Sequence, residues 1–84
     1  MITLQQVEDL IKQGIPGAQV QVNDLKGTGD HLEAIVVSDE FEGKSLVKQH
    51  QLVFSTLRDH LDSGIIHALA LQTYTVAKWN QQHS

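Results

Sequence analysis

The stretch Ile65–Trp79, IIHALALQTYTVAKW, decides the fold because it holds the most apolar run of the chain. Apolar and β-branched residues dominate positions 65–74 and a glycine stands just before them, a pattern typical of a strand. Thr75 then predicts the N-cap of a short helix over residues 76–82. One ionisable side chain, His67, lies within the predicted strand, and the two-residue period places it on the same face as Ile65, Leu69 and Leu71. His67 is therefore either a partly packed structural residue or a ligand at the rim of the sheet.

The chain of 84 residues is expected to form one domain, residues 1–84, with one small core. It has no cysteine, so this chain alone cannot hold an ordinary iron–sulfur cluster, which requires thiolates. A net charge of −4 disfavours broad, salt-driven binding to nucleic acid. The first residues do not have the pattern of a signal peptide, and no apolar run approaches the length of a membrane span. We therefore expect a cytoplasmic protein without membrane contact.

The residues before this stretch predict a helix, a hairpin and a second helix. Thr3 and Gln6 have the spacing of a capping box at the start of the first helix. Phe41 is expected to anchor a turn beneath the second helix, whose inner stripe is predicted to comprise Leu46, Val53, Leu57 and Leu61. In chain order, the expected elements are a helix over 3–13, strands over 18–25 and 32–38 joined by a flexible loop over 26–30, a turn over 39–43 and a helix over 44–61.

The order helix–strand–strand–helix–strand–helix restricts the topology. A short glycine-containing loop predicts an antiparallel hairpin for the first two strands. The third strand follows a long helix, so it should join the sheet parallel to one of them by a right-handed crossover. We predict an α+β fold in which helices cover one face of a three-stranded mixed sheet, as in small KH domains. The free edge of such a sheet also makes a homodimer conceivable.

Several short motifs, in order along the chain, resemble those of the BolA family. They are Val36-Val37-Ser38 with Phe41-Glu42-Gly43, the run Gln49-His50-Gln51-Leu52-Val53, the run Ile66-His67-Ala68-Leu69, and Thr73-Tyr74-Thr75 followed by Trp79. Each motif alone is weak, but their combined order and spacing cover nearly the whole chain. The run Gln49–Val53 departs from the family pattern, because glutamines flank His50 where arginines are usual.

The resemblance implies a KH-like (class II type) domain that acts in iron–sulfur cluster trafficking or iron regulation. It implies a heterodimer with a monothiol glutaredoxin that bridges a two-iron, two-sulfur cluster, in which the glutaredoxin and glutathione supply the thiolates. By the family's pattern His67 is one ligand, and a second ligand comes from the hairpin loop. That loop lacks a cysteine or histidine here, so three readings stay open: His31 substitutes, His67 acts alone, or the apo-glutaredoxin is the partner.

A second reading comes from family members regarded as transcriptional regulators. Five residues form a candidate surface for DNA or for an acidic partner: Lys44, Lys48, His50, Arg58 and Lys78. The spacing of Lys44 and Lys48 predicts that both project from one helix face. An ordinary solvated face is the plainer interpretation, and the chain lacks the glycine clamp of true KH domains and has few aromatic residues. No nucleophile–base pair is recognisable, so we expect no enzymatic activity.

Overall fold

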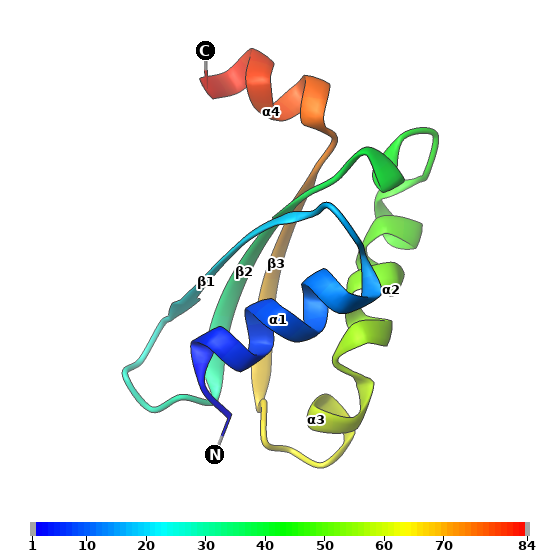
Figure 1. Cartoon of the computed structure of the whole chain (residues 1–84). Coiled ribbons are helices and arrows are strands. Elements are labelled where there is room, and N and C mark those ends of the chain that lie inside the picture. The colour runs from blue at the N-terminus through cyan, green and yellow to red at the C-terminus, as the bar shows by residue number, and fades with distance from the viewer. Residues whose placement is uncertain (1, 84) are drawn as a thin grey trace.

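The computed structural model describes residues 2–83 and confirms the predicted α+β architecture (Figure 1). The capping box at Thr3 is formed in both directions, and Thr75 accepts a hydrogen bond from the N–H of Lys78, as the sequence predicts. In chain order, the elements are α1 (Leu4–Gly14), β1 (Gln19–Asp24), β2 (His31–Val37), the 3₁₀ turn η1 (Asp39–Phe41), α2 (Leu46–Thr56), α3 (Arg58–Asp62), β3 (Ala68–Tyr74) and α4 (Val76–His83).

The three strands form one mixed sheet in the order β1-β2-β3. β1 pairs antiparallel with β2, and β3 pairs parallel with β2, as expected for a hairpin followed by a helical crossover. His31 is opposite Ala68 in the parallel register. Both the β1–β2 loop and the segment that leads into β3 therefore lie at one end of the sheet, and α4 lies at the other (Figure 1).

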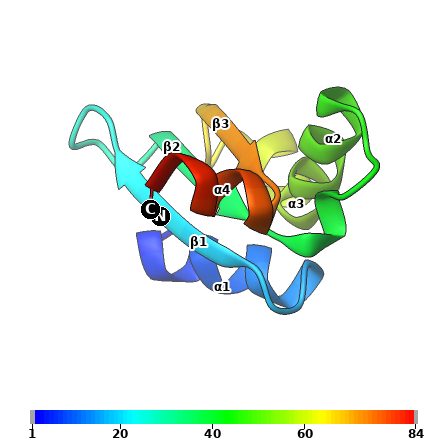
Figure 2. The ribbon, with the colours of Figure 1, turned by 90° about the horizontal axis from the view of Figure 1, so that it is seen from above.

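The core lies between the sheet and the helices α1 and α2, which share one side of it (Figures 1 and 2). α1 contributes Val7 and Ile11, which are fully buried and stand four residues apart on one helix face. Phe41 is also fully buried, which confirms that it anchors the turn. The other fully or nearly fully buried core side chains are Ile15, Leu32, Ala34, Val36, Val53, Leu57 and Ile66. Within residues 2–83 no helix has the length and apolarity needed to cross a membrane.

The prediction of a single helix over residues 44–61 is wrong. The segment forms two helices, α2 and α3, which are separated at Leu57. The backbone of Leu57 has φ −119° and ψ 12°, which is outside the helical region, and its side chain is fully buried. Its N–H bonds to the carbonyl of Phe54, three residues back, so the last turn of α2 tightens. Leu57 is thus buried at the point where the chain changes direction between the two helices. It is not part of the apolar stripe of one continuous helix.

The start of this helix also differs from the prediction. Ser45 is the N-cap of α2, because its hydroxyl accepts the N–H of Lys48, so Lys44 lies outside the helix. The expected helical pairing of Lys44 with Lys48 is therefore wrong. Leu46 occupies the first turn with 61% of its surface exposed, and it does not belong to the inner stripe.

The third strand begins at Ala68, three residues later than predicted. Ile65, Ile66 and His67 are still part of the connection from α3, as shown by the hydrogen bond from the N–H of Ile66 to the carbonyl of His60. Ile66 is buried here, whereas Ile65 and His67 are exposed. His67 therefore does not share a strand face with Leu69 and Leu71, because the regular alternation starts only after it.

Candidate functional site

Two of the histidines singled out in the sequence, His31 and His67, lie side by side. Their ring centroids are 5.3 Å apart and the ring planes are inclined by 43°. His31 is the first residue of β2, and His67 immediately precedes β3. The parallel register, with His31 opposite Ala68, therefore brings together two residues that are distant in the sequence.

This histidine pair is open to solvent at the rim of the sheet. The His31 side chain keeps 28% of its surface exposed, and His67 is an exposed residue. Neutral imidazole nitrogens are good ligands for iron and other transition metals. Among residues 2–83, no group of three or more His, Asp or Glu side chains is arranged to hold a metal ion. The pair could supply two imidazole nitrogens to a metal, and any further ligands would have to come from a second molecule.

Asp30 holds both histidines of the pair in place. Its Oδ1 lies 2.9 Å from Nδ1 of His31, and the Thr28 hydroxyl donates a hydrogen bond to the same oxygen. Its main-chain carbonyl accepts the N–H groups of His67 at 2.8 Å and of Ala68 at 3.0 Å. The hydrogen bonds from Thr28 and then from His31 hold the pKa of the Asp30 carboxyl below its ordinary value of 3.8. Asp30 is consequently an ionised hydrogen-bond acceptor at neutral pH.

The loop before Asp30 is built around a second carboxylate, that of Asp24. Oδ1 of Asp24 accepts the N–H groups of Lys26 at 3.3 Å and Gly27 at 2.9 Å, and Oδ2 accepts that of Gly29 at 2.8 Å. Both glycines have positive φ, 71° and 78°, a conformation that side-chain-bearing residues rarely adopt. In the structure these hydrogen bonds and turn conformations give the loop a defined shape that leads directly to Asp30.

Neither Asp24 nor Asp30 was identified by sequence reasoning as part of the site. A local signal for Asp24 is present, since an aspartate followed by two nearby glycines is typical of a side chain that caps loop N–H groups. No local signal marks Asp30, because its carbonyl bonds to a segment that is remote in the sequence.

Lys44, one residue of the candidate basic surface, lies beside carboxylates in the structure. Nζ of Lys44 bonds to the carbonyl of Glu40 at 2.8 Å, and Lys44 shares the wall of a hollow with Asp39, Glu40 and Glu42. These carboxylates oppose the approach of a phosphate backbone. They therefore weaken the case for Lys44 as a phosphate contact.

The other four members of the candidate basic surface lie on three different helices. Lys48 on α2, Arg58 on α3 and Lys78 on α4 are exposed. His50 is half-buried and its ring meets that of Phe54 edge-on, with centroids 6.3 Å apart, so it has a packing contact. The three exposed cations thus come from separate elements, and none of them belongs to the histidine pair.

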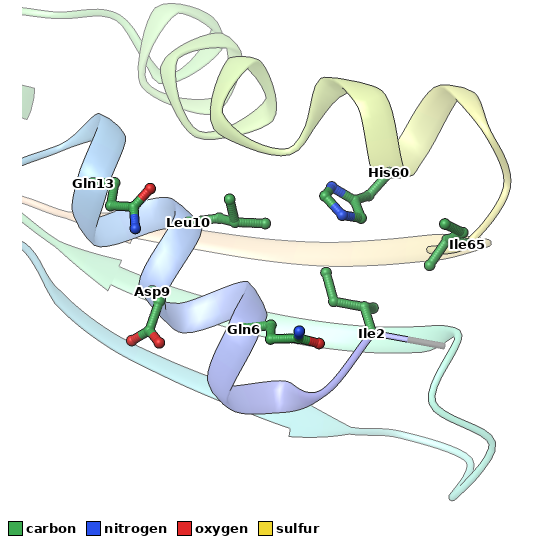
Figure 3. A pocket seen from close by; sticks show the side chains of 7 residues that line it. All are labelled: Ile2, Gln6, Asp9, Leu10, Gln13, His60 and Ile65. Carbon is green, nitrogen blue, oxygen red and sulfur yellow. The ribbon is translucent and has the colours of Figure 1, made fainter.

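A hollow of about 430 Å³ separates α1 from α3 (Figure 3). Figure 3 shows Ile2, Leu10 and the ring of His60 in the space between these helices, with the Asp9 side chain pointing away from it. The other lining residues are Gln6, Gln13 and Ile65. The lining mixes apolar and polar side chains, and the Asp9 carboxylate points away from the His60 ring, so the two do not form an acid–base pair in the hollow.

Comparison with known proteins adds family information to this geometry. A family model described as "BolA-like protein" matches residues 8–78. An uncharacterised protein of Haemophilus influenzae is 38% identical over 81 residues, which cover 96% of this chain and 92% of that protein. The Escherichia coli protein named DNA-binding transcriptional regulator BolA is 42% identical over 53 residues, covering 63% of this chain and 50% of that protein.

A solved structure agrees with the fold over nearly the whole chain. The structure of a BolA protein homologue from Coxiella burnetii superposes with a TM-score of 0.80 at 34% sequence identity. The superposition covers 95% of this chain and 99% of that one. The α+β architecture described above is therefore one that a solved relative shares.

Proposed function

The chain belongs to the BolA-like protein family, and on that premise we propose that it is an adaptor in iron–sulfur cluster trafficking or iron regulation. In this proposal it forms a heterodimer with a monothiol glutaredoxin, and a two-iron, two-sulfur cluster bridges the two proteins. The observation that carries the proposal is the histidine pair, His31 and His67, at an exposed rim with 5.3 Å between the ring centroids.

The donor set of the chain fits half of a shared site. A two-iron, two-sulfur cluster takes about four protein or cofactor ligands, and histidines replace two thiolates in Rieske centres. This chain has imidazoles at its rim and no cysteine, so the remaining thiolates would come from the glutaredoxin and glutathione. When bound, the cluster would supply electron-transfer or iron-donating chemistry. The role of this chain is to present one imidazole nitrogen from His31 and one from His67 in a fixed arrangement.

The adaptor proposal is tested with the reconstituted complex. This protein is mixed with a monothiol glutaredoxin, glutathione, iron and sulfide, and visible circular dichroism is compared with that of the glutaredoxin alone. We expect a new spectrum at one-to-one stoichiometry, which His67→Ala abolishes and His31→Ala changes. His83→Ala is the matched control, because His83 is exposed on α4 at the opposite end of the sheet. An identical spectrum in all four proteins would remove the histidine pair from the mechanism.

One relative favours a second candidate function, DNA binding by a transcriptional regulator. The E. coli relative named a DNA-binding transcriptional regulator is 42% identical over the matched segment. The exposed cations Lys48, Arg58 and Lys78 would then contact phosphates. Replacing each by alanine should weaken DNA binding and reduce its salt dependence, as measured by fluorescence anisotropy. Lys12→Ala is the control, since Lys12 is paired with Glu8 on α1, and equal effects of all the substitutions would contradict a specific surface.

A further inference from the structure

We infer that Asp30 is a positioning residue that selects the ligand atom of His31 and fixes the ring for the partner. The inference rests on the proposed function, because it assigns a role within the same site. Its geometric basis is the contact between Oδ1 of Asp30 and Nδ1 of His31 at 2.9 Å. A carboxylate only accepts hydrogen bonds, so Nδ1 must carry the proton and the lone pair of a neutral ring must be on Nε2. The nitrogen left free to bind a metal is therefore Nε2.

The direction of the Asp30 carboxylate is itself fixed. The Thr28 hydroxyl donates to the same Oδ1 that faces His31, so two partners fix the direction of this oxygen. Thr28 stands in the loop that Asp24 shapes through three N–H groups. The arrangement is a chain of contacts from the loop, through Thr28 and Asp30, to the imidazole. Carboxylates that orient metal-binding histidines in this way typically improve metal affinity by about 10- to 100-fold.

Asp30 acts on the second histidine through its main chain. Its carbonyl accepts the N–H of His67 at 2.8 Å, which holds the backbone of His67 beside the start of β2. One residue therefore orients one ring with its side chain and positions the other with its carbonyl. Because Asp30→Ala keeps the carbonyl, this substitution changes the control of His31 while the backbone contact with His67 remains.

The first test uses the free protein and needs no metal. The ring nitrogens of His31 are observed by long-range proton–nitrogen correlation NMR at a pH where the ring is neutral. We expect a protonated Nδ1 and a bare Nε2 in the native protein, and a shift towards the opposite tautomer in Asp30→Ala. Asp30→Asn retains an acceptor oxygen and should restore much of the native signature. Glu42→Ala, an exposed carboxylate in the turn after η1, is the control. An unchanged His31 tautomer in Asp30→Ala would overturn the inference.

The second test measures the shared cluster in the heterodimer with a monothiol glutaredoxin. We expect Asp30→Ala to lose its cluster about tenfold faster than the native complex, with partial recovery in Asp30→Asn. Far-ultraviolet circular dichroism and two-dimensional amide spectra establish that the variants are folded. Complete loss of the cluster signal in both variants, with an unchanged His31 tautomer, would make Asp30 a ligand itself and refute the positioning role.

The two tests separate this inference from the proposed function. A native protein that forms no shared cluster refutes the adaptor proposal, while the NMR result still decides whether Asp30 sets the tautomer of His31. A native complex that forms normally, with a tautomer and a rate of cluster loss that do not respond to Asp30→Ala, refutes only the role of Asp30.

Discussion

The main-chain carbonyl of Asp30 accepts the N–H of His67 at 2.8 Å, which joins the end of the hairpin loop to the chain just before β3. The same carbonyl accepts the N–H of Ala68 at 3.0 Å. The backbone of His67 is thus held by a hydrogen bond although His67 precedes the first residue of β3.

Amide hydrogen exchange should detect this connection. We expect the N–H of His67 to exchange slowly although His67 is exposed and lies outside the strand, because its amide is bonded to Asp30. The amides of Leu46 and Val47 are the comparison, since they precede the first intrahelical hydrogen bonds of α2. Equal, fast exchange at His67 and at these two positions would contradict the connection.

Acid should remove the contribution of Asp30 to stability. The pKa of Asp30 is lowered from 3.8 by Thr28 and His31, so its ionised form is favoured in the folded state. Its contribution is therefore fully present above the unfolded-state pKa and is lost as the pH falls through the lower, folded-state pKa. Urea unfolding of the native protein and Asp30→Ala should show a stability difference at about pH 6 that becomes smaller at about pH 2. A difference that grows on acidification would contradict the lowered pKa.

Phe41 should be among the most sensitive core positions. It is fully buried in the 3₁₀ turn and is the largest of the fully buried side chains. Phe41→Ala is expected to lower the free energy of unfolding by about 3–5 kcal/mol through lost burial and the cavity it leaves. Leu46→Ala should cost less than about 0.5 kcal/mol, because Leu46 is 61% exposed. Comparable losses in urea titrations of the two variants would show that Leu46 belongs to the core.

Gly14 should tolerate no side chain while Thr56 is present. A Cβ atom on Gly14 would lie 2.4 Å from Cγ2 of Thr56, where the end of α1 meets the end of α2. Gly14→Ala is expected to destabilise the protein by about 1–3 kcal/mol. The double variant with Thr56→Ser removes that methyl group and should recover part of the loss in thermal or urea unfolding. Additive effects of the two substitutions would show that the helices do not meet there.

Asp24 should control the shape of the hairpin loop. Asp24→Ala removes the acceptor of three loop N–H groups and is expected to speed the exchange of the Gly27 and Gly29 amides. The His31–His67 contact, followed through nuclear Overhauser effects between the rings, should weaken as the loop loses its shape. Glu33→Ala is the control, because Glu33 bonds to Asn23 across the hairpin and away from the loop amides. Native exchange rates in Asp24→Ala would show that the glycines alone define the loop.

The sequence predicted those features that local chemistry controls. The capping box at Thr3, the cap at Thr75 and the anchor Phe41 depend on neighbouring residues, so short patterns were sufficient. The break at Leu57 and the late start of β3 were missed because both depend on how the helices pack against the finished sheet. A helical period continues across Leu57 in the sequence, and nothing local indicates that the chain turns there.

The sequence singled out His31 and His67 as candidates but did not show how they are arranged. His67 and His31 came from the resemblance to the BolA family and from their positions near the hairpin loop. Their contact follows from the parallel register between β2 and β3, which a single sequence does not specify. The supporting role of Asp30 depends on the same register, since its carbonyl reaches a residue on the far side of the crossover.

The parallel pairing of β2 with β3 also fixes the order of events during biosynthesis. The hairpin can form as soon as β1 and β2 have been made, but His67 reaches His31 only after the crossover and β3 have joined the sheet. Such long-range pairing closes late, because the entropy of the intervening chain must first be lost. A nascent or partly folded chain therefore has no histidine pair, and the ligands of the proposed shared site come together only in the finished domain.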